Sequence, residues 1–170
     1  MTGAAFTVTL DAAPIEGMLE RLEIGIRDDR GLLAVLGEYG VASTQRRFET
    51  QASPEGVPWG ALNPAYASLK GAGYDILTLS GTLRRSQHFV LGLGAVAWGS
   101  SMIYAAVHQF GATIVPKNAP ALSFRLGLDA RWVHVQSVTI PARPYLGISA
   151  EDAEEIVALT QDYFARLIAG

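Results

Sequence analysis

Apolar residues recur at every third or fourth position in several stretches of this chain, which is the spacing of an amphipathic helix. The first such helix begins at Pro14, a residue that suits the first helical position, and ends before Asp28. Its apolar side consists of Ile15, Met18, Leu19, Leu22 and Ile26. The other helices predicted from spacing, caps and turn formers span residues 32–49, 63–70, 80–86, 103–110 and about 150–169.

Two of these helices carry specific packing predictions. Gly37 and Gly40 lie inside the second helix, where each glycine costs about 1 kcal/mol relative to alanine. That cost is easiest to accept if another part of the backbone packs closely there, and a kink is the alternative. In the C-terminal helix a broad apolar stripe is expected to be buried, formed by Ile156, Val157, Thr160, Tyr163, Phe164, Leu167 and Ile168.

Shorter apolar runs between turn formers predict β-strands. Two runs that meet around Gly92 and Gly94 predict a hairpin, and a second antiparallel pair is predicted around residues 127–130. Residues 76–79 are either a brief strand or an extended lead-in, and residues 112–120 are expected to form a turn. The predicted strands span residues 7–10, 88–93, 95–100, 121–126 and 131–140.

The segment of residues 140–149, called the elbow here, is where the chain changes direction before its last helix. Pro141 and Pro144 fix φ and remove backbone donors, so the segment is neither helical nor a central strand. Arg143 is therefore expected on a stiff, extended arm, with Tyr145 following as an apolar anchor. Ser149 and the acids after it form a variant of the capping box. The elbow thus aims the C-terminal helix, although it could simply turn a corner.

These elements predict an α+β fold. A small antiparallel sheet of about four to five strands is expected to pack against two N-terminal helices and a C-terminal helix. A chain of 170 residues has the length of one domain. We therefore predict a single domain over residues 1–170, with a helical part at about 11–70, a β-rich part at about 76–140 and the C-terminal helix at about 150–169.

Composition narrows the class of protein. A hydrophobic fraction of 49% with 17% charged residues predicts a folded chain, some of whose apolar surface is covered by other copies. The absence of cysteine excludes disulfides, thiol nucleophiles and cysteine zinc sites. No signal-peptide pattern is visible, and no apolar run reaches the roughly 20 residues that span a bilayer. No membrane partner is expected.

Charge is unevenly distributed along the chain. Residues 76–150 hold one acid and six bases, a net charge of +5. Residues 1–75 hold ten acids and six bases, and residues 151–170 hold five acids and one base, so each flank is −4. The split predicts either head-to-flank contacts between copies or contact with nucleic acid, unless it only reflects helices carrying more glutamate than strands do.

No motif indicates catalysis. Residues 92–97 loosely match a dinucleotide fingerprint, but strand-like residues follow and the required acid is missing about 20 residues on. His88, His108 and His134 are too far apart for a local metal site, and His108 has no nearby carboxylate. His88 and His134 are expected to be cross-strand neighbours of polar groups. We predict no enzyme, no catalytic or metal-binding residue, no cofactor and no small-molecule substrate.

Four fragments, in this order, carry a family resemblance: Phe48 with the loop Pro54–Trp59, Ile76–Leu83, Tyr104–Gly111 (YAAVHQFG) and Ile140–Gly147 (IPARPYLG). With Ser149 and the terminal helix, they resemble the phage virion morphogenesis (tail completion) family of Mu-like and P2-like tailed phages and prophages. The resemblance covers about residues 25–168. The chain departs from it after Gly111, where the family often has a basic, variable insertion and this sequence has a short turn.

The resemblance implies a structural protein of the virion neck or tail end that assembles as a homo-oligomeric ring. It would be made in the host cytoplasm and then enter the virion. The implied partners are other copies, other neck or tail proteins, and DNA in a central channel. We expect assembly or scaffold positions at Trp59, His108, Gln109, Phe110, Arg143 and Tyr145, with plain core and corner packing as the alternative.

Two other functions stay open at this point. A nucleic-acid-binding module would use a basic surface of Arg84, Arg85, Arg125 and Arg131, and its DNA affinity would fall steeply with salt. A small enzyme would need a pocket that joins His108 to a carboxylate.

Overall fold

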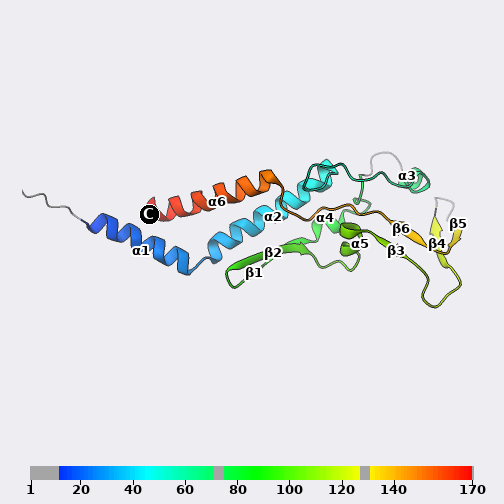
Figure 1. Ribbon diagram of the computed structural model, residues 1–170, viewed down its shortest axis with the longest axis horizontal. Helices are drawn as coiled ribbons and strands as arrows, with labels where there is room; N and C mark the ends of the chain where they lie inside the picture. The colour runs from blue at the N-terminus through cyan, green and yellow to red at the C-terminus, as the bar shows by residue number, and fades with distance from the viewer. Residues whose placement is uncertain (1–11, 71–74, 127–130, 170) are drawn as a thin grey trace, which may run out of the picture.

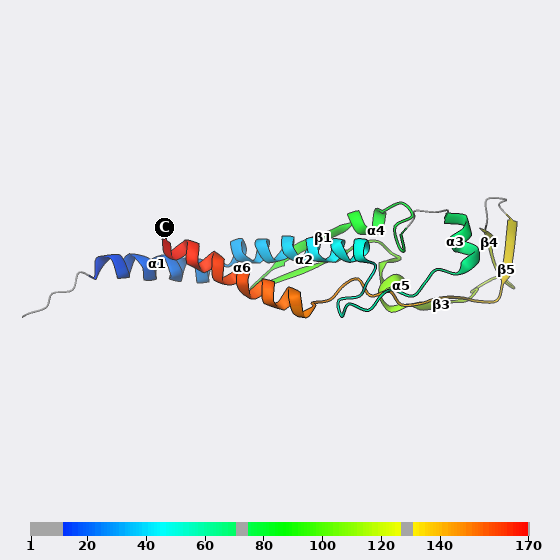
Figure 2. The same ribbon diagram turned by 90° about the horizontal axis from the view of Figure 1, so that it is seen from above.

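The helical spacing near the N-terminus produces two helices in succession, α1 (Ala13–Arg27) and α2 (Arg30–Thr50), as predicted. In this computed structural model, residues 12–70, 75–126 and 131–169 are described. The molecule is elongated, with α1 and the C-terminal end of α6 at one end and thin β-ribbons at the other (Figures 1 and 2). The remaining elements are α3 (Pro64–Lys70), α4 (Thr82–Arg85), β1 (Gln87–Gly92), β2 (Ala95–Ser100), α5 (Ala105–Phe110), β3 (Ala112–Ile114), β4 (Leu122–Leu126), β5 (Arg131–Val135), β6 (Val138–Ile140) and α6 (Ala150–Ala169).

The predicted hairpin around Gly92 and Gly94 is confirmed, and it packs on α2. Strands β1 and β2 pair antiparallel from Gln87 opposite Ser100 to Gly92 opposite Ala95. Side chains rather than backbone approach the two α2 glycines: a Cβ on Gly37 would lie 2.5 Å from Phe89 Cδ2, and one on Gly40 would lie 2.5 Å from Trp98 Cδ2. The glycines therefore let the aromatic face of the hairpin lie close to the helix axis.

The α+β class with antiparallel strands is confirmed, but the strands do not join into one sheet. The described residues contain three two-stranded ribbons, β1–β2, β3–β6 and β4–β5. The predicted strand 131–140 divides at a bend at Gln136. Its first part pairs with β4, and its second part pairs with β3, where a turn was expected over residues 112–120. A three-residue strand shows too little alternation to be recognised, and its partner is set by tertiary contacts.

The core is small and lies around the elbow. Among the described residues, the buried hydrophobic side chains are Phe48, Trp59, Leu83, Ala105 and Tyr145. Residues 76–79, expected as a strand or an extended lead-in, instead form a turn with φ of 62° at Leu77, and Ile76 and Leu77 pack against that core. The predicted strand 7–10 lies outside the described residues.

Two predicted apolar faces are less buried than expected. On α1, Leu19 and Ile26 are 55% and 66% exposed. On α6, Val157 is 55% exposed, although the other stripe residues up to Leu167 are half-buried. Helical spacing identifies a face that needs a partner, but it does not say that the partner is in the same chain. Within the described part of the chain, no helix is long and apolar enough to cross a membrane.

Candidate functional site

The elbow is held from one side by the side-chain amide of Gln109 on α5. Its Oε1 accepts hydrogen bonds from the backbone N–H groups of Tyr145 and Leu146, both at 2.9 Å. Its Nε2 donates to the carbonyl of Leu146 at 3.0 Å. One side chain thus satisfies three backbone groups that belong to no helix or strand, and it does so inside the part of the chain that the prolines keep extended.

A second brace comes from the loop after α2. The indole Nε1 of Trp59 donates to the carbonyl of Pro144 at 2.8 Å. The guanidinium of Arg143 points back into this loop, donating to the carbonyls of Gly60 at 2.9 Å and Ala61 at 3.1 Å. Arg143 is itself buried, and its backbone N–H donates to the carbonyl of His108 at 2.8 Å. The predicted stiff arm is therefore bonded on both of its sides.

Tyr145 is the buried anchor of the elbow. Its side chain is fully buried, with its ring 5.2 Å from that of Phe48, which in turn lies 5.6 Å from the ring of Trp59. Its hydroxyl donates to the carbonyl of Ala105 at 3.2 Å, and burial raises the pKa of that hydroxyl. The anchor thus joins the core to the elbow by both apolar contact and a hydrogen bond.

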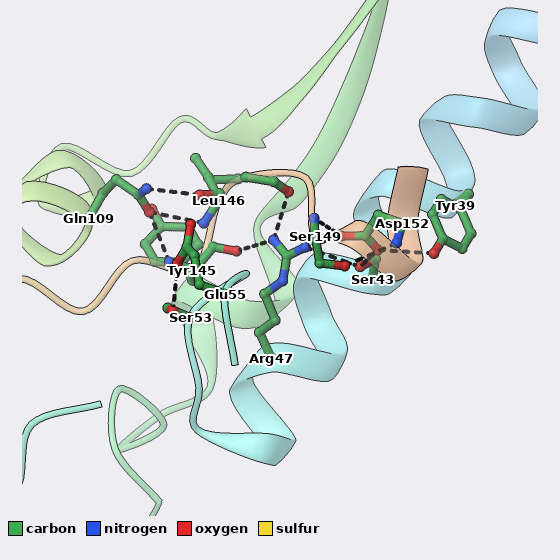
Figure 3. Close-up of polar contacts among 11 residues, drawn as sticks. Tyr39, Ser43, Arg47, Ser53, Glu55, Gln109, Tyr145, Leu146, Ser149 and Asp152 are labelled. Carbon is green, nitrogen blue, oxygen red and sulfur yellow. Dashed lines mark hydrogen bonds and ion pairs between the residues drawn. The ribbon is translucent and has the colours of Figure 1, made fainter. Parts of the chain in front are cut away.

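The other side of the elbow is held by Arg47, near the end of α2. This guanidinium donates to the carbonyls of Tyr145 and Gly147, both at 2.9 Å, and forms a buried ion pair with Asp152 in the first turn of α6 (Figure 3). Arg47 is 7% exposed and Asp152 is 5% exposed. A buried guanidinium that bonds both the bend and the first turn of α6 fixes the path of the chain into α6.

Asp152 accepts hydrogen bonds from α2 and from the elbow (Figure 3). Its carboxylate accepts from the hydroxyls of Ser43 and Tyr39 on α2 and from the backbone N–H of Ser149 at 2.8 Å. Its own N–H donates to the Ser149 hydroxyl at 3.0 Å, which confirms the predicted capping box. Together with Arg47 these residues form a cluster, called the clasp below: Tyr39, Ser43, Arg47, Ser149 and Asp152.

The clasp shifts the acidity of two of its members. Burial alone would raise the pKa of the Asp152 carboxyl, but hydrogen bonds from Ser43, Ser149 and Tyr39 outweigh it and lower that pKa to about 2. Burial and the hydrogen bond to Asp152 raise the pKa of Tyr39 to about 12. At neutral pH the carboxylate is therefore charged and the phenol is neutral, which suits a fixed structural contact.

The six predicted assembly or scaffold positions do not behave alike. Trp59, Gln109, Arg143 and Tyr145 meet at the elbow through side-chain bonds, and His108 joins them only through its backbone carbonyl. Phe110 is 77% exposed, so the alternative of plain core packing does not hold for that residue. Whether any of the six contacts another protein stays a prediction.

Sequence reasoning missed the pairing of Arg47 with Asp152. From the sequence, Arg47 is only a cation near the end of one helix and Asp152 only an acid near the start of another, each favourable to the dipole of its own helix. The available signal was weak: a capping box that ends in aspartate rather than glutamate. The two residues are 105 positions apart, and local patterns do not show such a contact.

The predicted basic surface does not form one patch. Arg84 pairs with Glu49, and Arg85 donates to the carbonyl of Ser80 at 2.8 Å. Arg125 lies on β4, far along the molecule from α4 (Figure 1), with its guanidinium 5.2 Å from the centre of the Trp132 ring. The side chain of Arg131 lies outside the described residues.

The histidines show no catalytic arrangement in the described residues. His134 hydrogen-bonds across the ribbon to the Ser123 hydroxyl at 2.8 Å, as expected. The ring of His88 instead hydrogen-bonds to the backbone carbonyl of Ser86, which directly precedes the same strand. Burial, and then the charge of Arg143, lower the pKa of His108. A shallow groove of about 350 Å³ lies between α2 and β1, and His108 does not line it. No group of three or more potential metal ligands occurs among the described residues.

Comparison with known proteins gives two matches. A model of the phage virion morphogenesis family matches residues 10–165. The putative capsid assembly protein G of Escherichia phage Mu is 32% identical over 154 residues, which cover 88% of this chain and 87% of that protein. No solved structure matches.

Proposed function

The chain belongs to the phage virion morphogenesis family, and on that basis we propose that it acts at the tail-completion or head–tail neck stage as a homo-oligomeric ring. A structural role in phage assembly follows from the family itself. The stage and the ring are the proposal. It would be made in the host cytoplasm and then become part of the neck or tail of the virion.

One observation carries the proposal: rigid elements are joined at the centre while large apolar side chains stay outside. The elbow is bonded to α2, α5 and the loop before α3, so the direction of α6 is set within the monomer. At the same time, side chains such as Ile26, Ile103 and Phe110 are 66%, 98% and 77% exposed. These side chains add no stability to an isolated monomer, whereas packing against other copies or other virion proteins would bury them.

The proposed partners are therefore other copies of the chain and other neck or tail proteins. DNA would pass through the central channel of the ring. Head-to-flank contact between copies also accounts for the division of charge, since the +5 segment of one copy would meet a −4 flank of the next.

A second function, head assembly, is favoured by the name of the Mu relative, a putative capsid assembly protein. The two functions differ in which particle would be missing if the protein were absent. A protein of the neck or tail end acts on finished heads and tails, whereas a capsid assembly protein acts before heads exist.

The test is to delete the gene from the phage or prophage that carries it and to image the particles by electron microscopy. We expect DNA-filled heads and separate tails in place of joined virions, with joining restored when the chain is supplied from a plasmid. Light scattering of the purified chain is expected to give the mass of a discrete oligomer. Loss of heads would instead support head assembly, and normal virions would overturn both functions.

A further inference from the structure

We propose that the two ends of the molecule bind each other in neighbouring copies, so that the helical end of one copy receives the ribbon end of the next. The helical end is α1 with the C-terminal half of α6, and the ribbon end is the β4–β5 ribbon with β3. This inference rests on the proposed homo-oligomer and names its interface.

The helical end presents an apolar seam. Ile15, Leu19, Leu22 and Ile26 are separated by four, three and four residues, so they lie on one side of α1. Three of them are 46%, 55% and 66% exposed, namely Ile15, Leu19 and Ile26. These exposed side chains form one contiguous strip along α1, which is the character of a surface that packs against a partner.

Helix α6 occupies a different side of α1 and leaves the seam open. A Cβ on Gly25 would lie 2.2 Å from Leu167 Cδ1, so α6 packs against the glycine side of α1. Arg21 closes the same side by donating to the carbonyls of Leu167 and Ile168, both at 2.9 Å. The contact between α1 and α6 is thus complete without the seam.

The open seam has an acidic border. Glu16, Glu20 and Glu23 are exposed and follow the seam along one side of α1. Arg27 pairs with Glu23 at 2.7 Å and offsets one of these charges. On the C-terminal half of α6, Asp162 is also exposed. A partner for this end must therefore be apolar at its centre and basic around it.

The ribbon end has that character. Trp132, Val115 and Ile114 are 59%, 57% and 41% exposed. Arg125 lies over the Trp132 ring, and the His134 ring stacks on the same tryptophan at 6.3 Å. From residue 76 to residue 150 the sequence contains one acid, Asp129, which lies outside the described residues.

The ribbon end also needs a partner for its stability. The β4–β5 pair is a hairpin that makes its main contacts within itself, and an isolated two-stranded hairpin is marginal in water. Packing its exposed tryptophan face on a helix seam would bury the side chains that are now in solvent. The chain thus has one end that lacks a partner and a second end of matching chemistry.

A second copy is the occupant that the charges favour. The two ends lie at opposite extremes of the long axis (Figures 1 and 2), so one copy cannot join its own ends. Two helical ends placed together would bring two acidic borders into one interface. Contact between unlike ends is heterologous, and such contacts close into a ring when the rotation between copies permits.

The test uses full-length chains with one end disabled. Ile26→Asp disables the helical end and Trp132→Asp disables the ribbon end, each at an exposed position. Val90→Asp, on the exposed side of β1 and 60% exposed, is the matched control. Circular dichroism melting verifies that all three variants fold, and sedimentation velocity gives their masses.

We expect each end variant alone to associate about 30-fold or more weakly than the native chain, the usual loss for a central interface anchor. Val90→Asp should associate normally. Mixing the two end variants should give a heterodimer that grows no further, because each variant keeps the end that the other lacks.

Two results would overturn the inference while leaving the proposed function intact. If Trp132→Asp still forms the native oligomer, the ribbon end is not in the interface. If both variants are monomeric and their mixture stays monomeric, the intact ribbon end of one does not bind the intact helical end of the other. Failure of the proposed function is seen separately, since the gene deletion would then leave joined virions unchanged.

Discussion

Around the elbow the protein buries charged and polar side chains in a bonded cluster, whereas at its helical and ribbon ends it exposes large apolar ones. At the centre, Arg47 and Asp152 are less than 10% exposed. The carbonyls of Tyr145 and Gly147 accept hydrogen bonds from Arg47, and the backbone N–H groups of Tyr145 and Leu146 donate to Gln109. At the ends, Ile26 and Trp132 are 66% and 59% exposed.

The difference indicates that the centre of the subunit provides stability and the ends provide association. Buried hydrogen bonds require fixed geometry, so the centre is expected to hold one arrangement of α2, elbow and α6. Apolar contacts do not require fixed angles, so the ends can adjust their packing as they bind a neighbour. If this division is correct, substitutions at the centre change stability and substitutions at the ends change association.

The largest effect is expected from Asp152→Asn. The change leaves the buried Arg47 guanidinium without its countercharge, which destabilises a protein by about 3–5 kcal/mol. Urea unfolding followed by circular dichroism measures it. Glu151→Gln, one residue earlier on the exposed side of α6, is the matched control and should change the unfolding free energy by less than about 0.5 kcal/mol. Equal effects from the two changes would remove the distinction between centre and surface.

A smaller loss is expected from Gln109→Ala. The substitution leaves the backbone N–H groups of Tyr145 and Leu146 without their acceptor, at about 1–3 kcal/mol for an unsatisfied buried group. Water can reach part of this half-buried site, so we expect about 2–3 kcal/mol in total. Gln45→Ala is the control, because the Gln45 amide makes only a long 3.4 Å bond to Arg84. Hydrogen exchange at Tyr145 and Leu146 should rise in the first variant and not in the second.

The pH dependence of stability tests the clasp without changing its shape. The Asp152 pKa is lowered from 3.8 to about 2, so the folded state favours the charged carboxylate. Its contribution, about 2 kcal/mol, is complete above pH 4 and is lost as the pH falls from about 4 to about 2. The difference in unfolding free energy between the native chain and Asp152→Asn should shrink by that amount over this interval. A difference that is constant with pH would mean that the charge of Asp152 is not what stabilises the clasp.

Local patterns predicted the elements that depend on local contacts. The repeat of apolar residues located α2, the turn glycines located the β1–β2 hairpin, and Ser149 located the start of α6. Each of these signals lies within about ten residues of chain. The elbow was also visible, because Pro141 and Pro144 restrict the backbone whatever surrounds them.

Contacts between distant segments were not predictable in the same way. The pairing of β3 with β6 and of Arg47 with Asp152 depends on where the elbow places the neighbouring segments. The local sequence of one partner contains no signal that identifies the other. The apolar faces of α1 and α6 failed for another reason. Their pattern marked apolar surface, but a sequence does not distinguish surface that is covered within the same chain from surface that stays exposed.

The smallest change in stability is expected when glycine is replaced by alanine, once in α1 and once in α2. The two replacements also contrast the end of the molecule with its centre. Gly17→Ala in α1 should stabilise the protein by up to about 1 kcal/mol, because alanine favours the helix and its Cβ would meet only Arg21 Nη1 at 3.7 Å. Gly40→Ala in α2 receives the same helical gain, but its Cβ would lie 2.5 Å from the Trp98 ring. Moving that ring costs about 1–3 kcal/mol, so a net loss of about 1 kcal/mol is expected. Thermal melting of the two variants measures both signs. If Gly40→Ala were stabilising as well, the hairpin would be able to move away from α2, and the centre would be no more closely packed than the ends.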